Sequence, residues 1–536
     1  MKTLDDKMLR SLQMTELECL KEVDRICVKN GIPYNIIAGT MLGAVRHKGF
    51  IPWDDDADVA LLRPEYERFK EALKRDLDTD RFYFQDHSET EGYRWGYGKL
   101  RRKDSLFLRE FQEHMPYEQG VFIDVFPLDP VPESKAGRTV WAVRCFLIRK
   151  ALWAKVGKVA DKSALKRLVF RCMDAIPEKT ILARLDRMID RSRRIKSRWV
   201  RILMFPTPNK EYGYLRKWYL SSAPIIFEGA ELAGVTDADE YLSFKFGDYM
   251  TLPPEEQRKT HPVSDIYMPD EKPDRLLAEI KERGCALYGT GYVAETVWKI
   301  FEEKNMTDAV RFFVETKKTK DSFHGVPVYS LKDAPLGEGP VVCIAVHDAV
   351  KDEIRNSLKS VYNGQAEWIY PYLKKWAYGD VLYEREIPLK ELIAAQAEEN
   401  FWITVRYAAL AEHLETGERR TAAEVYLKTQ SAFTDSKTAE ARLERLYGFS
   451  PDFDTDPIVI DTEYRVIDGL HRAAAALCFG KKTIKCAVVR ASDMFDKLLT
   501  DANRITPEAQ RRAGLTEEES AYLGRMKKEL LGKVLE

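Results

Sequence analysis

One stretch near the amino end, residues 39–59, constrains the fold and the chemistry of this chain more than any other. It opens with small residues after an apolar run and closes with four aspartates in five positions: Asp54, Asp55, Asp56 and Asp58. Like charges at this spacing repel one another, so a folded chain must gain something by holding them together. A bound divalent cation is the usual gain, because hard cations such as Mg²⁺ take oxygen ligands. The stretch therefore predicts a metal site.

The aspartates lead into a segment with strand character, residues 56–62. Residues two apart on a strand point to the same face, so we expect Asp56 and Asp58 to lie side by side. Asp54 continues the row if the extended backbone begins that early. Two carboxylates on one rigid strand would form a firm support for a metal ion.

A second apolar strand is expected at residues 34–38, and it ends at Gly39 and Thr40. Thr40 can cap a short helix there, whose free backbone N–H groups would face a phosphate. A third apolar strand, residues 121–127, contains the single charge of Asp124. An unpaired carboxylate inside an apolar strand is costly, so Asp124 is expected to face the same metal ions.

These elements together resemble the nucleotidyltransferase fold of the DNA polymerase beta superfamily. The run of residues 39–59, Gly98-Lys99-Leu100 and residues 122–129 resemble more closely the LicD family of phosphotransferases, which includes the fukutin-related proteins. The resemblance predicts a catalytic domain over residues 1–265, with a mixed sheet and a helical cover.

The LicD resemblance implies transfer of a phospho-alcohol from a CDP-activated donor to a hydroxyl of a cell-surface glycan, with release of CMP. Phosphocholine is the best-known group transferred, and phosphoribitol and phosphoglycerol are close relatives. Such transfer depends on charge neutralisation and positioning. The implied cofactor is Mg²⁺ or Mn²⁺, held by Asp54, Asp56, Asp58 and Asp124, the last three also catalytic. The implied substrate-binding residues are Gly39, Thr40, Arg46, His47, Lys48, Lys99, Arg258 and His261.

A basic helical insertion is expected at residues 133–205. From residue 133 to residue 200 the chain has 19 Lys or Arg and 6 Asp or Glu, with apolar residues at helical spacing. Such a segment can lie on an anionic membrane surface. The alternative is a solvated helical cover whose apolar face packs on the catalytic sheet.

A small Rossmann-like domain with a parallel sheet is expected at residues 275–375. A strand leads into Gly289-Thr290-Gly291, and a second strand ends in Glu315 about twenty residues later. This arrangement is typical of a nucleotide or sugar-nucleotide site at Gly289, Gly291 and Glu315. The glycines could instead serve only close packing of helix on strand.

The remaining residues, 380–536, resemble a ParB/sulfiredoxin-like α+β domain with helical flanks. The resemblance rests on strand, turn and helix around Gly469-Leu470-His471-Arg472. Gly469, His471 and Arg472 would bind the phosphate of CTP or ATP at the helix N-terminus. A degenerate structural module is the alternative. No basic recognition stripe is present, so nucleic acid is not an expected partner.

Composition is consistent with an α/β and α+β multidomain protein of 536 residues, with 45% hydrophobic and 32% charged residues and a net charge of −1. The eight cysteines are scattered, which favours reduced thiols. The first residues are charged, and no apolar run is long enough to cross a bilayer. We expect a cytoplasmic protein, with contact to the inner face of the membrane left open.

Other functions remain open at this stage. The chain could be a non-catalytic scaffold of a polysaccharide pathway, in which case it need not bind metal. It could be a nucleotidyltransferase that makes a CDP-activated compound from CTP and releases pyrophosphate. It could also fuse a kinase to the transferase, with the carboxyl-terminal domain phosphorylating an alcohol for the same pathway.

Overall fold

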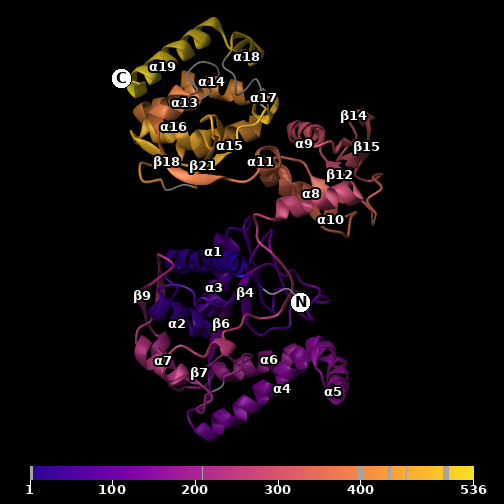
Figure 1. Ribbon diagram of the computed structural model, residues 1–536, viewed down its shortest axis with the longest axis vertical. Coiled ribbons are helices and arrows are strands. Elements are labelled where there is room, and N and C mark those ends of the chain that lie inside the picture. The colour runs from indigo at the N-terminus through magenta and orange to yellow at the C-terminus, as the bar shows by residue number, and fades with distance from the viewer. Residues whose placement is uncertain are drawn as a thin grey trace. The chain divides into compact units, whose positions relative to one another are not determined.

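The computed structural model describes residues 4–535, apart from 208, 338, 396–402, 432–435, 454–455 and 499–505. The chain divides into two compact units, Met1–Lys272 and Pro273–Glu536. Each unit combines sheets with covering helices (Figure 1). The mixed α/β multidomain architecture predicted from the sequence is therefore confirmed.

A mixed sheet forms the centre of the first unit, in the strand order β3-β4-β6-β2-β1-β10-β9, and β7 pairs with β6 and β8. Strands β2 and β6 are parallel and lie in the middle. Their residues are almost all buried, as expected where helices cover both faces of a sheet. The strands are β1 (Asn35–Ile36), β2 (Asp58–Leu62), β3 (Phe82–Gln85), β4 (Gly98–Arg102), β6 (Phe122–Pro130), β7 (Trp199–Arg201), β8 (Tyr214–Leu215), β9 (Ser222–Phe227) and β10 (Ala230–Val235). A separate pair joins β5 (Leu106–Arg109) to β11 (Val263–Tyr267).

Helix α1 (Asp6–Asn30) shows why the sequence predicts its elements well here. The Asp5 side chain caps its first turn, and Gly31, with φ of 57°, ends it in the left-handed conformation. Its apolar stripe packs on the sheet together with α3 (Arg63–Asp76), which has Pro64 in its first turn. Local signals in the sequence thus account for both ends of α1 and for the start of α3. The unit also contains α2 (Ala38–His47) and α7 (Ala238–Phe246).

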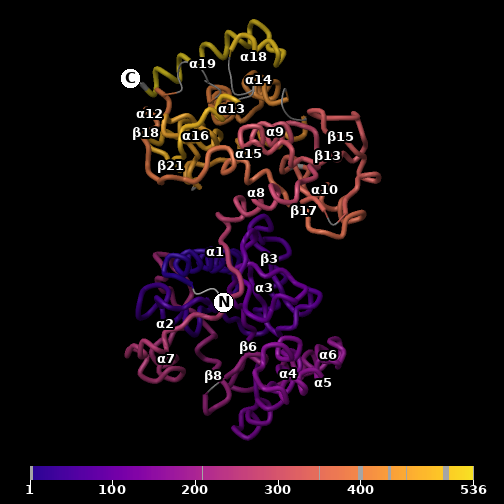
Figure 2. Tube along the Cα trace, turned by 45° about the vertical axis from the view of Figure 1, so that its right-hand side comes forward, coloured from indigo at the N-terminus to yellow at the C-terminus, as the bar shows by residue number. Residues whose placement is uncertain are grey.

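The basic segment forms α4 (Lys135–Ala160), α5 (Ala164–Asp174) and α6 (Glu178–Arg193). These helices lie beside one another as a layer next to the sheet, seen in Figure 1 and from a second direction in Figure 2. One face of α4 packs on α6 through Trp141, Cys145 and Leu152, and α6 in turn contacts β6 of the sheet.

The first half of the second unit is built on a largely parallel sheet, in the order β14-β15-β13-β12-β16-β17. Its strands are β12 (Cys285–Tyr288), β13 (Val310–Glu315), β14 (Ser322–Phe323), β15 (Val326–Ser330), β16 (Val341–Ile344) and β17 (Ala366–Trp368). Its helices are α8 (Lys272–Arg283), α9 (Tyr292–Glu303), α10 (Lys351–Lys359) and α11 (Leu373–Tyr378). The predicted strand, Gly-x-Gly turn and helix are present as β12 and α9.

The second half has a smaller sheet, in the order β18-β21-β19-β20. Its strands are β18 (Tyr383–Pro388), β19 (Ile458–Asp461), β20 (Val466–Asp468) and β21 (Thr483–Val489). Helices cover it: α12 (Leu389–Ala394), α13 (Ile403–Thr416), α14 (Thr421–Ser431), α15 (Ser436–Tyr447), α16 (Leu470–Cys478), α17 (Met494–Leu498), α18 (Pro507–Arg512) and α19 (Glu517–Leu535). Within the described ranges, no helix is both long and apolar enough to cross a membrane.

Candidate functional site

Two acidic residues are neighbours on adjacent strands in the middle of the first sheet. Asp58 at the start of β2 pairs in register with Asp124 of the parallel strand β6. Lys99 of the antiparallel strand β4 stands opposite Asp124 on its other side, and its Nζ donates a hydrogen bond to Asp124 Oδ1. Both Lys99 and Asp124 are buried. The sheet thus holds these three predicted site residues in one row.

The strand that carries Asp58 is shorter than the sequence predicts. β2 begins at Asp58, so Asp56 and Asp54 lie in the non-regular segment before it rather than on the strand. The segment is held by its own contacts: the Asp54 N–H donates to the carbonyl of Ile51 at 2.9 Å, and the Gln13 amide donates to the carbonyl of Asp54 at 3.0 Å. The aspartates therefore gather through a loop rather than through strand alternation.

Gly39 makes room for the Asp54 carboxylate. A Cβ atom placed on Gly39 would lie 2.6 Å from Asp54 Oδ2, closer than real contacts allow. Thr40 does not cap a helix, in contrast to the prediction, because α2 already begins at Ala38 with Ile37 as its N-cap. The Thr40 hydroxyl instead accepts a hydrogen bond of 2.8 Å from the backbone N–H of Asp58. Gly39 and Thr40 thus position the acidic residues.

The acidic side chains repel one another in a poorly solvated place. Burial, together with the charges of Asp56 and Asp55, raises the pKa of Asp54 to about 8. Burial also raises the pKa of Asp58 well above its usual value, and the charges of Asp56 and Asp124 add to the shift. The pKa of Asp56 is raised by burial against the lowering effect of Arg109. Ionisation of these carboxyl groups is therefore unfavourable in the folded chain.

Three further charged residues border this cluster, and sequence reasoning did not identify them. Glu16 of α1 is buried, its Oε2 has no hydrogen-bond partner among the described residues, and burial and the nearby aspartates raise its pKa. Its signal in the sequence is a charge inside the apolar stripe of a helix. Arg109 of β5 acts on Asp56, and Lys245 of α7 acts on Asp58, and both lower the pKa of that carboxyl. Neither cation belongs to a pattern that the sequence makes visible.

The donor set has the chemistry of a divalent-cation site, but its side chains do not enclose one point. In the part of the chain that the structure describes, no three His, Cys, Asp or Glu side chains converge closely enough to hold a metal ion. Asp124 contacts Lys99, and Asp55 contacts His261 through Nδ1 at 2.9 Å and through the backbone N–H at 2.8 Å. Cationic and polar groups of the protein thus occupy part of the acidic cluster.

The predicted phosphate-binding cations gather around Trp53. The Arg258 guanidinium lies 4.8 Å from the Trp53 ring centre, and the His47 ring meets the same indole edge-on at 6.2 Å. Arg46 donates to His47 Nε2 at 2.9 Å, and the nearby Arg258 charge together with burial lowers the pKa of Arg46. Lys48 ends α2 in the left-handed conformation and is exposed. Arg46, His47 and Arg258 therefore form one basic group.

The Gly-x-Gly turn of the second unit has different surroundings at its two glycines. Gly289 has φ of 115°, and a Cβ there would lie 2.8 Å from the carbonyl oxygen of Ala345, so this glycine serves close backbone packing. Gly291 faces open space. Glu315 accepts hydrogen bonds from Thr290 and Thr319, and these lower its pKa although burial alone would raise it. The three predicted residues lie together at the carboxyl ends of the parallel strands β12 and β13.

The second predicted nucleotide-binding turn lies at the start of α16. Gly469 has φ of 95°, and the His471 Nε2 is 2.6 Å from the Tyr426 hydroxyl. Arg472 donates to the carbonyls of Asp456 and Pro457. Burial lowers the pKa of His471 well below its usual value, and nearby positive charges add to the shift: Arg406, Arg442, Arg445 and Arg472. Several cations thus surround this turn, and Asp468, which precedes Gly469, pairs with Arg472 and with Lys374.

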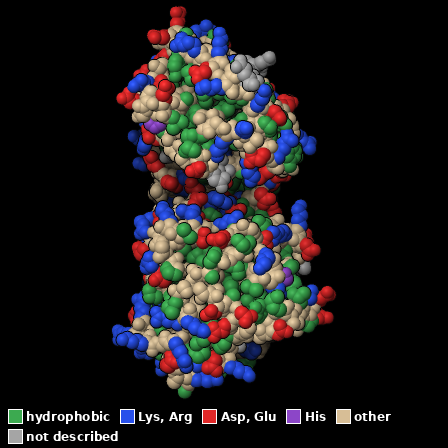
Figure 3. All heavy atoms as spheres, turned by 90° about the vertical axis from the view of Figure 1, so that its left-hand side faces the viewer, with side chains coloured by type: hydrophobic (Ala, Val, Ile, Leu, Met, Phe, Trp, Pro, Cys, Tyr) green, Lys and Arg blue, Asp and Glu red, His purple; other side chains and the backbone are tan. Residues whose placement is uncertain are grey.

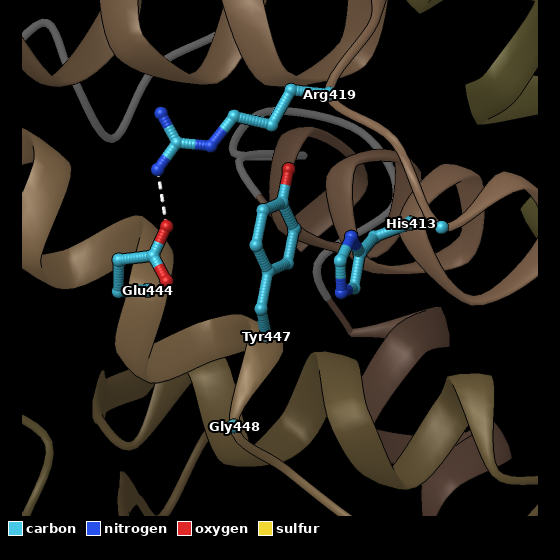
Figure 4. A pocket seen from close by; sticks show the side chains of 6 residues that line it. His413, Arg419, Glu444, Tyr447 and Gly448 are labelled. Carbon is cyan, nitrogen blue, oxygen red and sulfur yellow. Dashed lines mark hydrogen bonds and ion pairs between the residues drawn. The ribbon is translucent and has the colours of Figure 1, made fainter.

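A separate open pocket of about 440 Å³ lies among the helices of the same unit. Figure 4 shows the His413 and Tyr447 rings stacked beside each other, with Arg419 paired to Glu444 at the rim. None of its lining residues was predicted as a site, and Arg419 already has two carboxylate partners, Glu440 and Glu444. It carries no chemistry related to the acidic cluster.

Comparison with known proteins relates the first unit to one family. Residues 31–143 match the family model described as LicD/FKTN/FKRP, nucleotidyltransferase domain. The chain is 27% identical over 281 residues to the lipopolysaccharide cholinephosphotransferase LicD of Haemophilus influenzae, covering 48% of this chain and 98% of that protein. It is 36% identical over 77 residues to an uncharacterized protein of Rickettsia typhi (13% of this chain, 25% of that protein). It is 27% identical over 137 residues to one of Rickettsia prowazekii (24% and 47%). The chain is therefore similar to LicD-family proteins, and residues 31–143, within the first unit, match the nucleotidyltransferase domain of that family.

Proposed function

We propose that this chain is a LicD-type phosphotransferase, which transfers a phospho-alcohol from a CDP-activated donor to a hydroxyl of a cell-surface glycan or its precursor and releases CMP. The relative from Haemophilus influenzae is a lipopolysaccharide cholinephosphotransferase, which favours phosphocholine as the group transferred. The observation that carries the proposal is the register of Asp58 with Asp124, with Asp54 and Asp56 beside them in one partly buried acidic cluster.

We further propose that the cluster binds Mg²⁺ or Mn²⁺ through Asp54, Asp56, Asp58 and Asp124. The support is chemical: hard carboxylate oxygens, little solvent, and like charges that a divalent cation would offset. A bound cation of this kind supplies charge neutralisation at the diphosphate of the donor. Because Lys99 contacts Asp124, loading of the site requires Lys99 to share or release that carboxylate.

The protein's own cations have separate roles in this proposal. Arg46, His47 and Arg258 form the basic group near Trp53 and would bind phosphate oxygens of the donor. Lys48, exposed at the end of the same helix, could join them. Lys99 would orient Asp124, and Asp124 would then accept the proton of the acceptor hydroxyl.

For the second unit we propose nucleotide binding at two turns. The Rossmann-like half would use Gly291 and Glu315, where open space adjoins the first turn of α9. The ParB/sulfiredoxin-like half would bind the phosphates of CTP or ATP at the start of α16, because several arginines surround His471. Such a site could regulate the transferase or, as a kinase, supply its alcohol phosphate.

Product analysis of the purified full chain tests the proposed function. The chain is incubated with CDP-choline, CDP-ribitol or CDP-glycerol, with and without Mg²⁺, and nucleotide products are separated by chromatography. We expect CMP from at least one donor, only when metal is present. In a parallel incubation with CTP and an alcohol phosphate, release of pyrophosphate without CMP would instead identify a nucleotidyltransferase. Absence of both products together with no Mg²⁺ binding by calorimetry would identify a scaffold.

A further inference from the structure

Helix α4 carries apolar residues on two faces, and the protein covers only one of them. Trp141, Cys145 and Leu152 pack inward on α6. Val140, Val143, Phe146 and Leu147 lie on the opposite side of the first half of the helix, where each is about half exposed. Spacings of three and four residues place these four side chains on one stripe. A helix that is apolar on two faces is normally buried on both.

Helix α5 shows the same feature more strongly. Leu165, Leu168 and Val169 form its apolar stripe and are exposed, Leu165 by 71%. Phe170 is the buried residue of this helix, and it packs where Gly157 of α4 leaves room, since a Cβ on Gly157 would lie 2.7 Å from the Phe170 ring. An amphipathic helix of a soluble domain turns its apolar stripe toward the core. Here the stripe faces outward.

Positive charge surrounds these outward stripes. Residues 135–174 contain 11 Lys or Arg and 2 Asp or Glu, and one of the acids, Asp174, is already paired with Lys158 and Arg94. Lys150 lies 5.6 Å from the Phe146 ring centre and 5.8 Å from that of Phe170, so cations border the apolar side chains directly. Figure 3 shows Lys and Arg side chains gathered at the lower edge of the first unit, the level that α4 and α5 occupy in Figure 1.

We propose that the outward faces of α4 and α5 dock on an anionic lipid surface. The docking face consists of Val140, Val143, Phe146, Leu147, Leu165, Leu168 and Val169, with the surrounding Lys and Arg. Apolar side chains enter the boundary between headgroups and acyl chains, while the cations contact lipid phosphates. An exposed apolar patch rimmed by one sign of charge has the chemistry of a membrane surface. This inference does not depend on the catalytic proposal, because it uses none of the acidic-cluster residues.

Vesicle co-sedimentation of the full chain tests the docking face. Sucrose-loaded vesicles of phosphatidylcholine with about 30% phosphatidylglycerol are compared with pure phosphatidylcholine, at low and at high salt. We expect binding to the anionic vesicles that weakens at high salt. The variant with Leu147→Ser and Leu168→Ser should bind at least tenfold more weakly. The variant with Lys166→Glu and Arg171→Glu should lose about fivefold for each cation removed.

A matched control keeps the test specific. Leu220 is 57% exposed, as Leu147 is, and Leu382 is similarly exposed in the second unit. The variant with Leu220→Ser and Leu382→Ser should bind vesicles as the wild type does. Equal binding of neutral and anionic vesicles, or unchanged binding of the Leu147/Leu168 variant, would overturn the proposal. So would sedimentation analysis in which the wild type is a dimer that the Leu147/Leu168 variant dissociates, because the stripes would then join two copies of the chain.

Discussion

Asp58 lies directly opposite Asp124 across the parallel strands β2 and β6. In a sheet without a ligand, two neighbouring carboxylates gain nothing from each other. Burial raises the pKa of Asp58, and the charges of Asp56 and Asp124 raise it further. The chain retains both, with Lys99 in contact with Asp124 on the far side. This arrangement is the physical basis of the proposed metal site and of the following predictions.

Removal of the Asp58 charge should stabilise the metal-free protein. Burial and the neighbouring carboxylates raise the pKa of Asp58 in the folded state, so its ionised form opposes folding at neutral pH. Asp58→Asn should therefore increase the free energy of unfolding by about 1–2 kcal/mol in EDTA. Thermal unfolding at pH 7 measures this. The exposed Asp190→Asn serves as the control and should leave the midpoint unchanged. A lower midpoint for Asp58→Asn would show that the carboxylate stabilises the fold without metal.

Substitution of Gly39 should misplace Asp54. A Cβ at Gly39 would lie 2.6 Å from Asp54 Oδ2, so Gly39→Ala must push the carboxylate away from α2. We expect at least a tenfold weaker Mg²⁺ affinity by calorimetry, with the fold retained by circular dichroism. Gly524→Ala is the matched control, because a Cβ there meets nothing within 4 Å. Equal affinities of the two variants would remove Asp54 from the ligand set.

A buried ion pair between α3 and β6 should matter for stability. Arg63 of α3 donates to both oxygens of Asp129 on β6, at 2.8 and 2.6 Å, and both side chains are buried. Asp129→Ala leaves the Arg63 charge without this partner and should cost about 3–5 kcal/mol in urea unfolding. The exposed pair Glu71–Lys74 provides the comparison, and Glu71→Ala should be indistinguishable from wild type. Similar losses for both variants would contradict this account.

The cationic surroundings of α16 predict nucleotide binding that depends on Arg442. Arg442 donates to His347 Nε2 at 2.9 Å and to Gln430 at 3.2 Å, both uncharged acceptors, and its charge acts on His471. Arg442→Gln should weaken CTP or ATP binding to the full chain by roughly tenfold or more, since charge-assisted bonds to phosphate are worth about 1.5–3 kcal/mol. Isothermal calorimetry measures the affinity. Arg419→Gln, which breaks an exposed ion pair, should bind nucleotide normally. No binding by the wild type would refute nucleotide binding at this turn.

The spacing of apolar residues, together with the residues that start and end helices, predicts most of the architecture. The apolar stripe of α1 and its Gly31 terminator, the Pro64 start of α3 and the charged strand around Asp124 all have local causes, and the structure contains each of them. The Gly289-Thr290-Gly291 turn likewise follows a buried strand and precedes a helix, as its composition predicts.

The rest of the site depends on contacts between distant segments. Alternation along a strand predicts Asp56 beside Asp58 on β2, but β2 begins only at Asp58. The Asp54 carbonyl instead accepts from the Gln13 side chain of α1, and the Asp58 N–H donates to Thr40 of α2. Glu16 and Arg109 approach the aspartates from elements that are distant in the sequence. No local pattern reveals such convergence, since it is created by packing of α1 and β5 around the sheet.

The central claim is that the acidic cluster near β2 uses a divalent cation to cleave the donor diphosphate. The most direct measurement is CMP release from CDP-choline by wild type and Asp58→Asn, each with Mg²⁺ and with EDTA. This account predicts turnover by the wild type with Mg²⁺ only, and a loss of at least a thousandfold in Asp58→Asn, which remains folded. Turnover by Asp58→Asn at the wild-type rate, or turnover by the wild type in EDTA, would contradict it.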